Sequence, residues 1–437
     1  MILDNHVMRD TTRPTRGLFW FRHDLRFHDQ VALSSLCQQV DELTLLYIID
    51  DSWFVPNSYG IQPVGEHRFN FLIDTIEALN EKASTLGHSI LTLKGQTPEL
   101  LVSLLSSNAF THFGVTEHGG YNERREVEAV SRFLPNIEIV TGESSSLFNQ
   151  DDLPFNLEVM PDVFTPFKRK IESAIKPREP MATLTALPRS YTPDIDAECQ
   201  YTLNRRPPRN QAEGTFVGGE DAALSHLNSY LFEWKVAASY KETRNALDNW
   251  RDSTKLSPWL ATGALSARYV IQEVKKYEQN VVKNDSTYWI YFELLWREYF
   301  YWLQQKFGSK WFQLEGIKSK LPNTSHDPQV FVGWCNGQTG YPIVDACMRQ
   351  LASTGYLSNR GRQLVASCLV NELRQDWRYG AAWFESQLLD YDVASNWGNW
   401  LYLAGVGTDP RENRQFNLQK QTEIYDPKGE FCAKWLD

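Results

Sequence analysis

Apolar and polar positions alternate in two ways along the first third of the chain. Short apolar runs rich in β-branched and aromatic residues predict strands at 17–22, 43–50, 89–95, 111–117 and 137–143. Between them, apolar residues recur at helical spacing near 66–86, 97–107 and 122–133. This alternation predicts an α/β domain with a doubly wound parallel sheet over residues 17–145, after an N-terminal extension of residues 1–16. No G-x-G-x-x-G or G-x-x-x-x-G-K-[ST] accompanies it, so the sheet carries no dinucleotide fingerprint and no P-loop.

A proline-rich stretch separates this part from the rest of the chain. Residues 176–210 show little apolar periodicity and contain Pro177, Pro180, Pro188, Pro193, Pro207 and Pro208. Such a composition is typical of a long surface connector, which we place at residues 146–215. Beyond it the periodicity is mostly helical, most clearly over 292–303, so residues 216–437 are expected to form an all-α domain.

The composition is that of an ordinary globular protein, with 437 residues, 42% hydrophobic and 22% charged. No run of about 18 apolar residues occurs, and no apolar segment follows the first charges, so we expect a soluble cytoplasmic protein without a membrane partner. Six cysteines form no C-x-x-C pair and no zinc-like cluster, which predicts free thiols in a reducing compartment and no metal site. A formal charge of −10 argues against a surface that binds nucleic acid everywhere but is compatible with a local basic groove.

Tryptophan is concentrated after position 230, where thirteen of the fifteen residues lie. Most buried tryptophans fill volume and anchor packing, and we expect that role for most of these. On the predicted helix at 292–303, however, Glu293, Trp296, Arg297 and Phe300 share one face at i, i+3, i+4 and i+7. Because charges among aromatic rings are costly to bury unpaired, this face either holds an internal ion pair or lines a polar, aromatic cavity.

Two further segments combine polar groups with aromatic ones. In 388–411, Asp390, Asp392 and Asn396 precede Trp400 and Tyr402. Two acids at this spacing could bind a metal, but there is no histidine nearby and no calcium-loop spacing. Carboxylates and amides also match the N–H and carbonyl groups of a polar heteroaromatic ligand, which is the interpretation we favour.

The second segment, 240–266, places Ser253, Thr254, Lys255 and Ser257 before a predicted helix. Their hydroxyl groups could cap that helix. The same hydroxyls and the free N–H groups could instead receive a phosphate or pyrophosphate, with Lys255 adding positive charge. The segment by itself leaves both roles open.

Taken together, these segments resemble the photolyase/cryptochrome family over nearly the whole chain, from FWFRHDLRFHD (19–29) to YDPKGEFCAKWLD (425–437). TGYPIVDACMRQL (339–351), SNRGRQ (358–363) and DYDVASNWGNW (390–400) are long, ordered and correctly spaced for that family. MPDVFTPFKRKIE (160–172), YKETRN, SNRGRQ and NWGNWLY are similar to its cryptochrome DASH branch. The resemblance implies an N-terminal α/β domain, a long connector and an all-helical domain that binds FAD in a folded conformation.

The resemblance also assigns residues to roles. The FAD contacts it implies are Tyr240, Ser253, Thr254, Lys255, Leu256, Ser257, Arg362, Asp390, Asp392 and Asn396, with Arg362 and Asp390 paired beside the isoalloxazine and Asn396 near flavin N5. The residues that would contact DNA or the lesion are Arg244, Glu293, Trp296, Arg297, Asn359, Arg360 and Tyr402. Glu293, Trp296, Asn396 and Tyr402 would take part in catalysis, with Trp296 and Tyr402 flanking the lesion.

The activity it implies is light-driven, FAD-dependent cleavage of cyclobutane pyrimidine dimers in DNA by electron transfer, in a monomer. Many photolyases carry Trp where this chain has Tyr402, so we expect weaker binding of the flipped lesion. Weaker binding compensates less for the free energy of unpairing a duplex, so we expect a preference for single-stranded DNA. The alternative is a flavin photoreceptor that signals without repair.

Two further features of the family are the tryptophans used for photoreduction and an antenna chromophore. Photoreduction in the family uses three tryptophans; Trp400 and Trp377 match the first two, but the third position falls at Thr324, which cannot relay an electron hole. Another aromatic residue such as Trp311 or a nearby tyrosine would then take over, or photoreduction is weak. The branch also often holds 5,10-methenyltetrahydrofolate as an antenna between the domains, with Glu123 as the acidic contact we assign to it.

Overall fold

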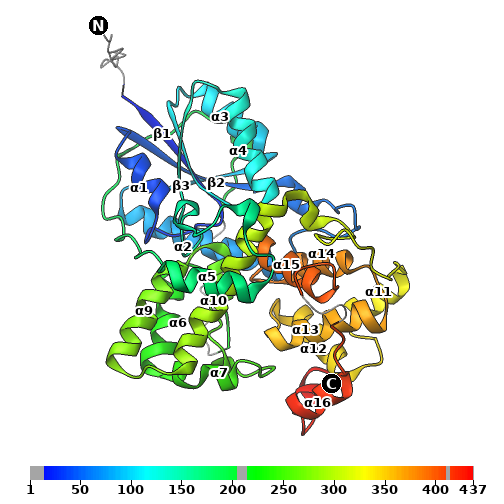
Figure 1. Ribbon diagram of the computed structural model, residues 1–437. Helices are drawn as coiled ribbons and strands as arrows, with labels where there is room; N and C mark the ends of the chain where they lie inside the picture. Colours follow the sequence, from blue (N-terminus) through cyan, green and yellow to red (C-terminus); the bar gives the residue numbers. More distant parts are fainter. Residues whose placement is uncertain (1–13, 204–213, 410–413, 437) are drawn as a thin grey trace.

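Five of the six strands of a parallel sheet are those that the alternating pattern predicts (Figure 1). The computed structural model describes residues 14–203, 214–409 and 414–436, so most of the expected N-terminal extension lies outside the described residues. The strands are β1 (Arg16–Phe21), β2 (Glu42–Asp50), β3 (Ile90–Gly95), β4 (His112–Thr116) and β5 (Glu138–Gly142). Their order is β3-β2-β1-β4-β5, and each neighbouring pair is parallel, which confirms the doubly wound arrangement.

Both faces of the sheet are buried, which explains why its strands read as continuous apolar runs. Phe19 and Phe21 of β1 pack in a core with residues of helices α1 (Val31–Cys37) and α2 (Glu66–Thr85). Leu18 and Trp20 point to the opposite face, where α3 (Thr97–Ser107) and α4 (Tyr121–Phe133) cover them. Helix α1 was not predicted, because seven residues are too few for a clear helical period.

The connector is more ordered than its prolines indicate. Helix α5 (Phe164–Ala174) buries Phe164, Phe167 and Ile171 in the core of the helical domain. Farther on, the short strand β6 (Arg189–Ser190) pairs in parallel with the start of β2, at Glu42 and Leu43. The connector therefore contributes to both domains; its residues 204–213 lie outside the described part of the chain.

The rest of the chain is helical, as expected. Its helices are α6 (Glu220–Asn228), α7 (Tyr240–Thr243), α8 (Ser257–Thr262), α9 (Ala267–Asn280), α10 (Asp285–Phe307), α11 (Pro328–Cys335), α12 (Pro342–Thr354), α13 (Asn359–Ser367), α14 (Trp377–Gln387), α15 (Val393–Leu403), α16 (Leu418–Tyr425) and α17 (Glu430–Leu436). The longest, α10, starts at a capping box on Asn284 and contains the predicted segment 292–303.

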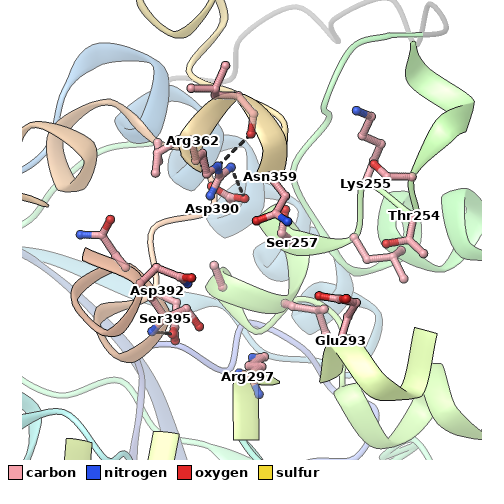
Figure 2. A pocket seen from close by; sticks show the side chains of 18 of the residues that line it. Thr254, Lys255, Ser257, Glu293, Arg297, Asn359, Arg362, Asp390, Asp392 and Ser395 are labelled. Atoms are coloured by element: carbon pink, nitrogen blue, oxygen red, sulfur yellow. Dashed lines mark hydrogen bonds and ion pairs between the residues drawn. The ribbon is translucent and has the colours of Figure 1, made fainter. Parts of the chain in front are cut away.

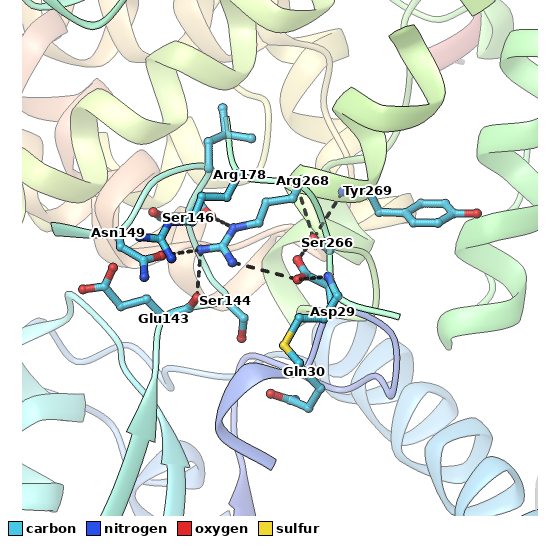
Figure 3. A network of polar contacts seen from close by, with 12 residues as sticks. Asp29, Gln30, Glu143, Ser144, Ser146, Asn149, Arg178, Ser266, Arg268 and Tyr269 are labelled. Carbon is cyan, nitrogen blue, oxygen red and sulfur yellow. Dashed lines mark hydrogen bonds and ion pairs between the residues drawn. The ribbon is translucent and has the colours of Figure 1, made fainter. Parts of the chain in front are cut away.

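A buried polar network fixes the helical domain against the sheet domain (Figure 3). The Arg268 guanidinium, at the start of α9, donates to the carbonyls of Glu143 and Ser146 and to the Asn149 side chain. The hydroxyl of Ser266, the N-cap of α9, hydrogen-bonds to the Asp29 carboxylate. A buried guanidinium is tolerated only when its donors are paired, so these bonds hold the joint in one geometry.

The same joint includes a close backbone approach. The fully buried Arg26 donates to the carbonyl oxygens of Gly263 and Ser144, both at 2.7 Å. Gly263 ends α8 with φ of +70°, and a Cβ there would lie 1.9 Å from the carbonyl oxygen of His23. Only glycine allows the two segments to approach this closely.

The six cysteines all lie in the described residues and are unpaired, as predicted. Among those same residues, none of the helices combines the length and apolarity needed to span a bilayer. Nor does this part of the chain contain a group of three or more His, Cys, Asp or Glu side chains placed to hold a metal ion.

Candidate functional site

One cavity in the helical domain brings together polar residues that are far apart in the sequence (Figure 2). Its walls come from α7, the loop before α8, α10, α13 and α15. All ten residues predicted to contact the cofactor line it: Tyr240, Ser253, Thr254, Lys255, Leu256, Ser257, Arg362, Asp390, Asp392 and Asn396. Arg244, Glu293, Arg297, Asn359 and Trp400 line it too. Tertiary packing therefore joins the three segments singled out above into one site.

The loop 253–257 forms one end of the cavity. Lys255 adopts a left-handed backbone conformation with φ of +53°, which is unusual for a residue other than glycine. Its ammonium group lies 3.5 Å from the Tyr356 hydroxyl and above the Tyr356 ring. In α8, whose residues are all described, the N-cap residue is Leu256 and no side chain caps it, so helix capping does not explain the hydroxyls of this loop.

Arg362 and Asp390 form a fixed ion pair at another wall of the cavity. Arg362 Nη2 lies 2.9 and 2.7 Å from the two carboxylate oxygens of Asp390, and its Nε donates to the carbonyl oxygen of Leu357 at 2.8 Å. The Asp390 side chain is only 2% exposed and that of Arg362 is 25% exposed. Charge-assisted bonds in such surroundings orient both groups firmly.

Asp392 and Asn396 project from the start of α15. The Asp392 carboxylate caps the helix by accepting a bond from the Ser395 N–H at 2.7 Å. Burial opposes its ionisation, but the charge of Arg297 and the bond from Ser395 outweigh that effect, so its pKa lies below the ordinary value. The Asn396 amide donates to the Ala381 carbonyl at 3.0 Å, which fixes the orientation of its side chain. The two acids of this segment thus have separate partners and do not form a metal-binding pair.

The helical face around Glu293 satisfies both interpretations that the sequence left open. Glu293 Oε1 lies 2.6 Å from Arg244 Nη1, and the Trp289 indole donates to the same oxygen at 3.1 Å. Glu293 also faces the cavity with 30% of its side chain exposed. Burial raises the pKa of Glu293 above its ordinary value, although Arg244 and Trp289 oppose the increase.

Arg297, one turn later on the same helix, also lines the cavity. Its Nη1 donates to the Ser145 carbonyl at 2.7 Å, which links this wall to the segment that leaves the sheet domain.

Trp296, Tyr402 and Arg360 do not line this cavity. The Trp296 ring stacks on Phe164 of α5 at 3.7 Å and lies nearly perpendicular to the Tyr402 ring, with centroids 5.9 Å apart. These two rings therefore form a corner rather than two parallel walls.

Arg360 is close enough to two other guanidinium groups, those of Arg244 and Arg414, for their charges to affect it. Burial, and then the charges of Arg244 and Arg414, lower the pKa of Arg360, although its neighbour Tyr425 opposes the change. Arg414 covers the Tyr402 ring at 4.6 Å and is held by Asp409 at 3.1 Å. Sequence reasoning missed Arg414, because it follows a segment without periodicity or motif.

The aromatic and antenna residues occupy other places. Trp400 lies in the cavity wall, Trp377 is fully buried at the start of α14, and Thr324 lies in the loop before α11. Glu123 lines a second cavity, between the two domains. Burial opposes the ionisation of Glu123, but His23 at 3.4 Å and the nearby His118 hold its pKa well below the ordinary value.

Comparisons with known proteins agree with this geometry. The family described as DNA photolyase matches residues 17–188, and the FAD binding domain of DNA photolyase matches residues 289–437. The cryptochrome DASH of Idiomarina loihiensis is 45% identical, over 96% of this chain and 92% of its own length. This chain belongs to the photolyase/cryptochrome family. The family resemblance and the two-part fold expected from the sequence are thereby confirmed.

Solved structures of the photolyase/cryptochrome family superpose closely. The crystal structure of a Synechocystis cryptochrome has a TM-score of 0.90 and 39% identity, covering 97% of this chain and 89% of that one. An archaeal photolyase from Sulfolobus tokodaii, solved with two FAD molecules, has a TM-score of 0.77 and 25% identity, covering 97% and 90%. The protein is thus a flavin-dependent member of the family, with FAD as its cofactor.

Proposed function

We propose that this protein uses light to split cyclobutane pyrimidine dimers in DNA and that it prefers single-stranded substrates. The observation that supports this most directly is the shared cavity, in which four residues expected at the lesion, Arg244, Glu293, Arg297 and Asn359, line the same space as the ten expected at FAD. A flavin that only senses light has no evident need for charged groups of this kind beside it.

The residues of the cavity fit FAD. The loop 253–257 offers hydroxyls, backbone N–H groups and the Lys255 charge for a pyrophosphate. Arg362, Asp390 and Asn396 are held in fixed orientations and suit a ring with N–H and carbonyl groups. When bound, FAD supplies the light absorption and the one-electron redox chemistry.

The protein's own share of the reaction is to place the lesion. Glu293, whose pKa is raised by burial, is suited to donate a hydrogen bond in its protonated form and so to stabilise negative charge that develops on the dimer. Trp296 and Tyr402 stand perpendicular to each other, and stacking of a base on an aromatic ring that remains open is worth about 1–3 kcal/mol. The guanidinium groups of Arg244, Arg360 and Arg414 are suited to hold phosphates of the backbone despite the net negative charge.

The strand preference depends on Tyr402. A phenol ring offers less stacking area than an indole, so it compensates less for the few kcal/mol that flipping a dimer out of a duplex requires. The test compares dimer repair in single-stranded and duplex oligonucleotides for the wild type, Tyr402→Trp and the control Tyr402→Phe. We expect Tyr402→Trp alone to improve repair of the duplex relative to the single strand. Equal repair of both substrates by the wild type would contradict the preference.

Repair itself is tested with protein whose FAD has been reduced chemically beforehand, so that photoreduction plays no part. We expect illumination to restore dimer-containing single strands and Glu293→Gln to slow the reaction. A wild-type protein that binds FAD but restores neither substrate would refute the repair proposal and favour a signalling photoreceptor.

For the cavity between the domains we propose an antenna folate. Glu123, held ionised by His23, could accept hydrogen bonds from a pterin amino group, and Glu126, Arg22 and Trp53 line the same space. Mass spectrometry of the pigments released from purified protein tests this, with Glu123→Gln expected to lose the folate and keep FAD. Retention of folate by the variant would contradict the assignment.

A further inference from the structure

Trp377 has an aromatic neighbour on the adjacent helix α15. The Trp377 ring packs edge to face on Trp397, with centroids 5.8 Å apart. Trp397 lies on α15, one turn before Trp400 in the wall of the FAD cavity. Trp400 in turn packs on Gly380 of α14, one turn after Trp377, so closely that a Cβ at Gly380 would lie 2.3 Å from the indole. Trp377 and Trp397 are therefore in direct contact, and Trp400 lies one turn further along both helices.

Trp397 is connected to a tyrosine and a carboxyl group. Its indole N–H donates to the Tyr391 hydroxyl at 3.3 Å. Glu385, Tyr391 and Trp397 line the same cavity between the domains, and hydrogen bonding from the two rings opposes the increase that burial causes in the pKa of Glu385. Tyr391 is half-buried and lines the cavity between the domains, and the Arg68 guanidinium covers its ring at 4.4 Å.

Trp311 is the other aromatic residue considered for the outer end of the electron route. The Trp311 ring packs beside Phe300, with centroids 6.4 Å apart, and among the described residues it makes no ring contact with Trp377 or Trp400.

We infer that the oxidising equivalent leaves the FAD cavity through Trp400, Trp377 and Trp397 and ends on Tyr391, whose phenolic proton passes to Glu385. This inference depends on FAD binding but not on the proposed repair of DNA. Bound FAD would supply the one-electron oxidant on illumination, and each oxidised aromatic residue of the route would take one electron from the next residue. At the end Tyr391 has lost one electron and one proton and is a neutral radical, and the Glu385 carboxylate has become a carboxylic acid.

Charge explains why the proton must move. A cationic ring at Tyr391 would be repelled by the guanidinium of Arg68, whereas a neutral radical is not. Burial raises the pKa of Glu385, which makes its carboxylate a better proton acceptor. Once the proton has moved, return of the electron requires the proton to return too, so the separated state lasts longer.

Flash illumination of the FAD-containing protein, followed by transient absorption and electron paramagnetic resonance, tests the route. We expect a tyrosyl signal in the wild type that disappears in Tyr391→Phe and in Trp397→Phe. In Glu385→Gln we expect a tryptophan radical that returns to the ground state at least about tenfold faster than the wild-type tyrosyl radical. Tyr379→Phe, which alters a neighbouring tyrosine stacked on His326, is the matched control and should keep the wild-type signal.

The inference is wrong if the wild type shows no tyrosyl radical, or if the signal persists in Tyr391→Phe. Bound FAD and an unchanged melting temperature establish that each variant is folded. Repair by chemically reduced wild-type protein is measured separately, because it needs no relay. If the protein shows a tyrosyl signal but no repair, the proposed function is wrong and the relay is still supported. If it shows repair but no tyrosyl signal, only the relay is wrong.

Discussion

Replacing Asp390 by Asn should weaken FAD binding by about tenfold. The substitution keeps the shape of the side chain and one acceptor but removes the charge that Arg362 Nη2 contacts at 2.7 and 2.9 Å. A hydrogen bond to a charged group contributes about 1.5–3 kcal/mol. Because Arg362 keeps its second anchor on the Leu357 carbonyl, we expect the lower end of that range. About 1.4 kcal/mol corresponds to a tenfold change in Kd.

The assay is the Kd for FAD, measured from the fluorescence of flavin released on dilution. Asp376→Asn is a matched control, because Asp376 also pairs with an arginine, Arg378, at 2.7 Å and the pair is similarly buried, with exposures of 9% and 27%. That pair does not line the FAD cavity. A Kd for Asp390→Asn within twofold of the wild type, or an equal loss in Asp376→Asn, would refute the role assigned to the Arg362–Asp390 pair.

Three further outcomes follow from the geometry. Trp400→Phe should slow flavin photoreduction by an order of magnitude or more, measured by absorption under continuous light, and an unchanged rate would exclude Trp400 from the route. Gly380→Ala should cost about 1–3 kcal/mol in thermal unfolding by overpacking against the Trp400 indole, and a wild-type melting temperature would show that the indole can move. Burial raises the pKa of Glu298 to about 7, so the protonated side chain contributes stability that is complete below pH 4.5 and is lost as the pH rises through 7. The loss is worth roughly 3 kcal/mol. Melting temperatures measured across this pH range should therefore fall in the wild type and lack this fall in Glu298→Gln.

The strands and helices of the sheet domain could be predicted because their periods report burial within a single element. Residues such as Phe19 and Trp20 alternate between two buried faces, and that alternation is visible in the sequence. The two polar segments, 253–257 and 388–396, could be singled out as candidate ligand contacts because hydroxyl, amide and carboxyl groups stand there among aromatic residues. The strand β6, at Arg189 and Ser190, could not be found, since two residues show no period.

What tertiary structure alone decided is which of these groups meet. Arg244 and Glu293 are 49 positions apart and form one ion pair, so the sequence could not choose between an internal pair and a cavity wall, and the folded chain forms both. Trp397 contacts Trp377 only because α14 and α15 pack together, and no spacing along the chain indicates it. Side-chain pattern along a chain records whether a position is buried, whereas ion pairs, cavities and aromatic contacts depend on how distant segments pack. The sequence therefore determined the family, the elements and the polar residues assigned to the cofactor, and the packing of the helices determined the shared cavity and the aromatic contacts beside it.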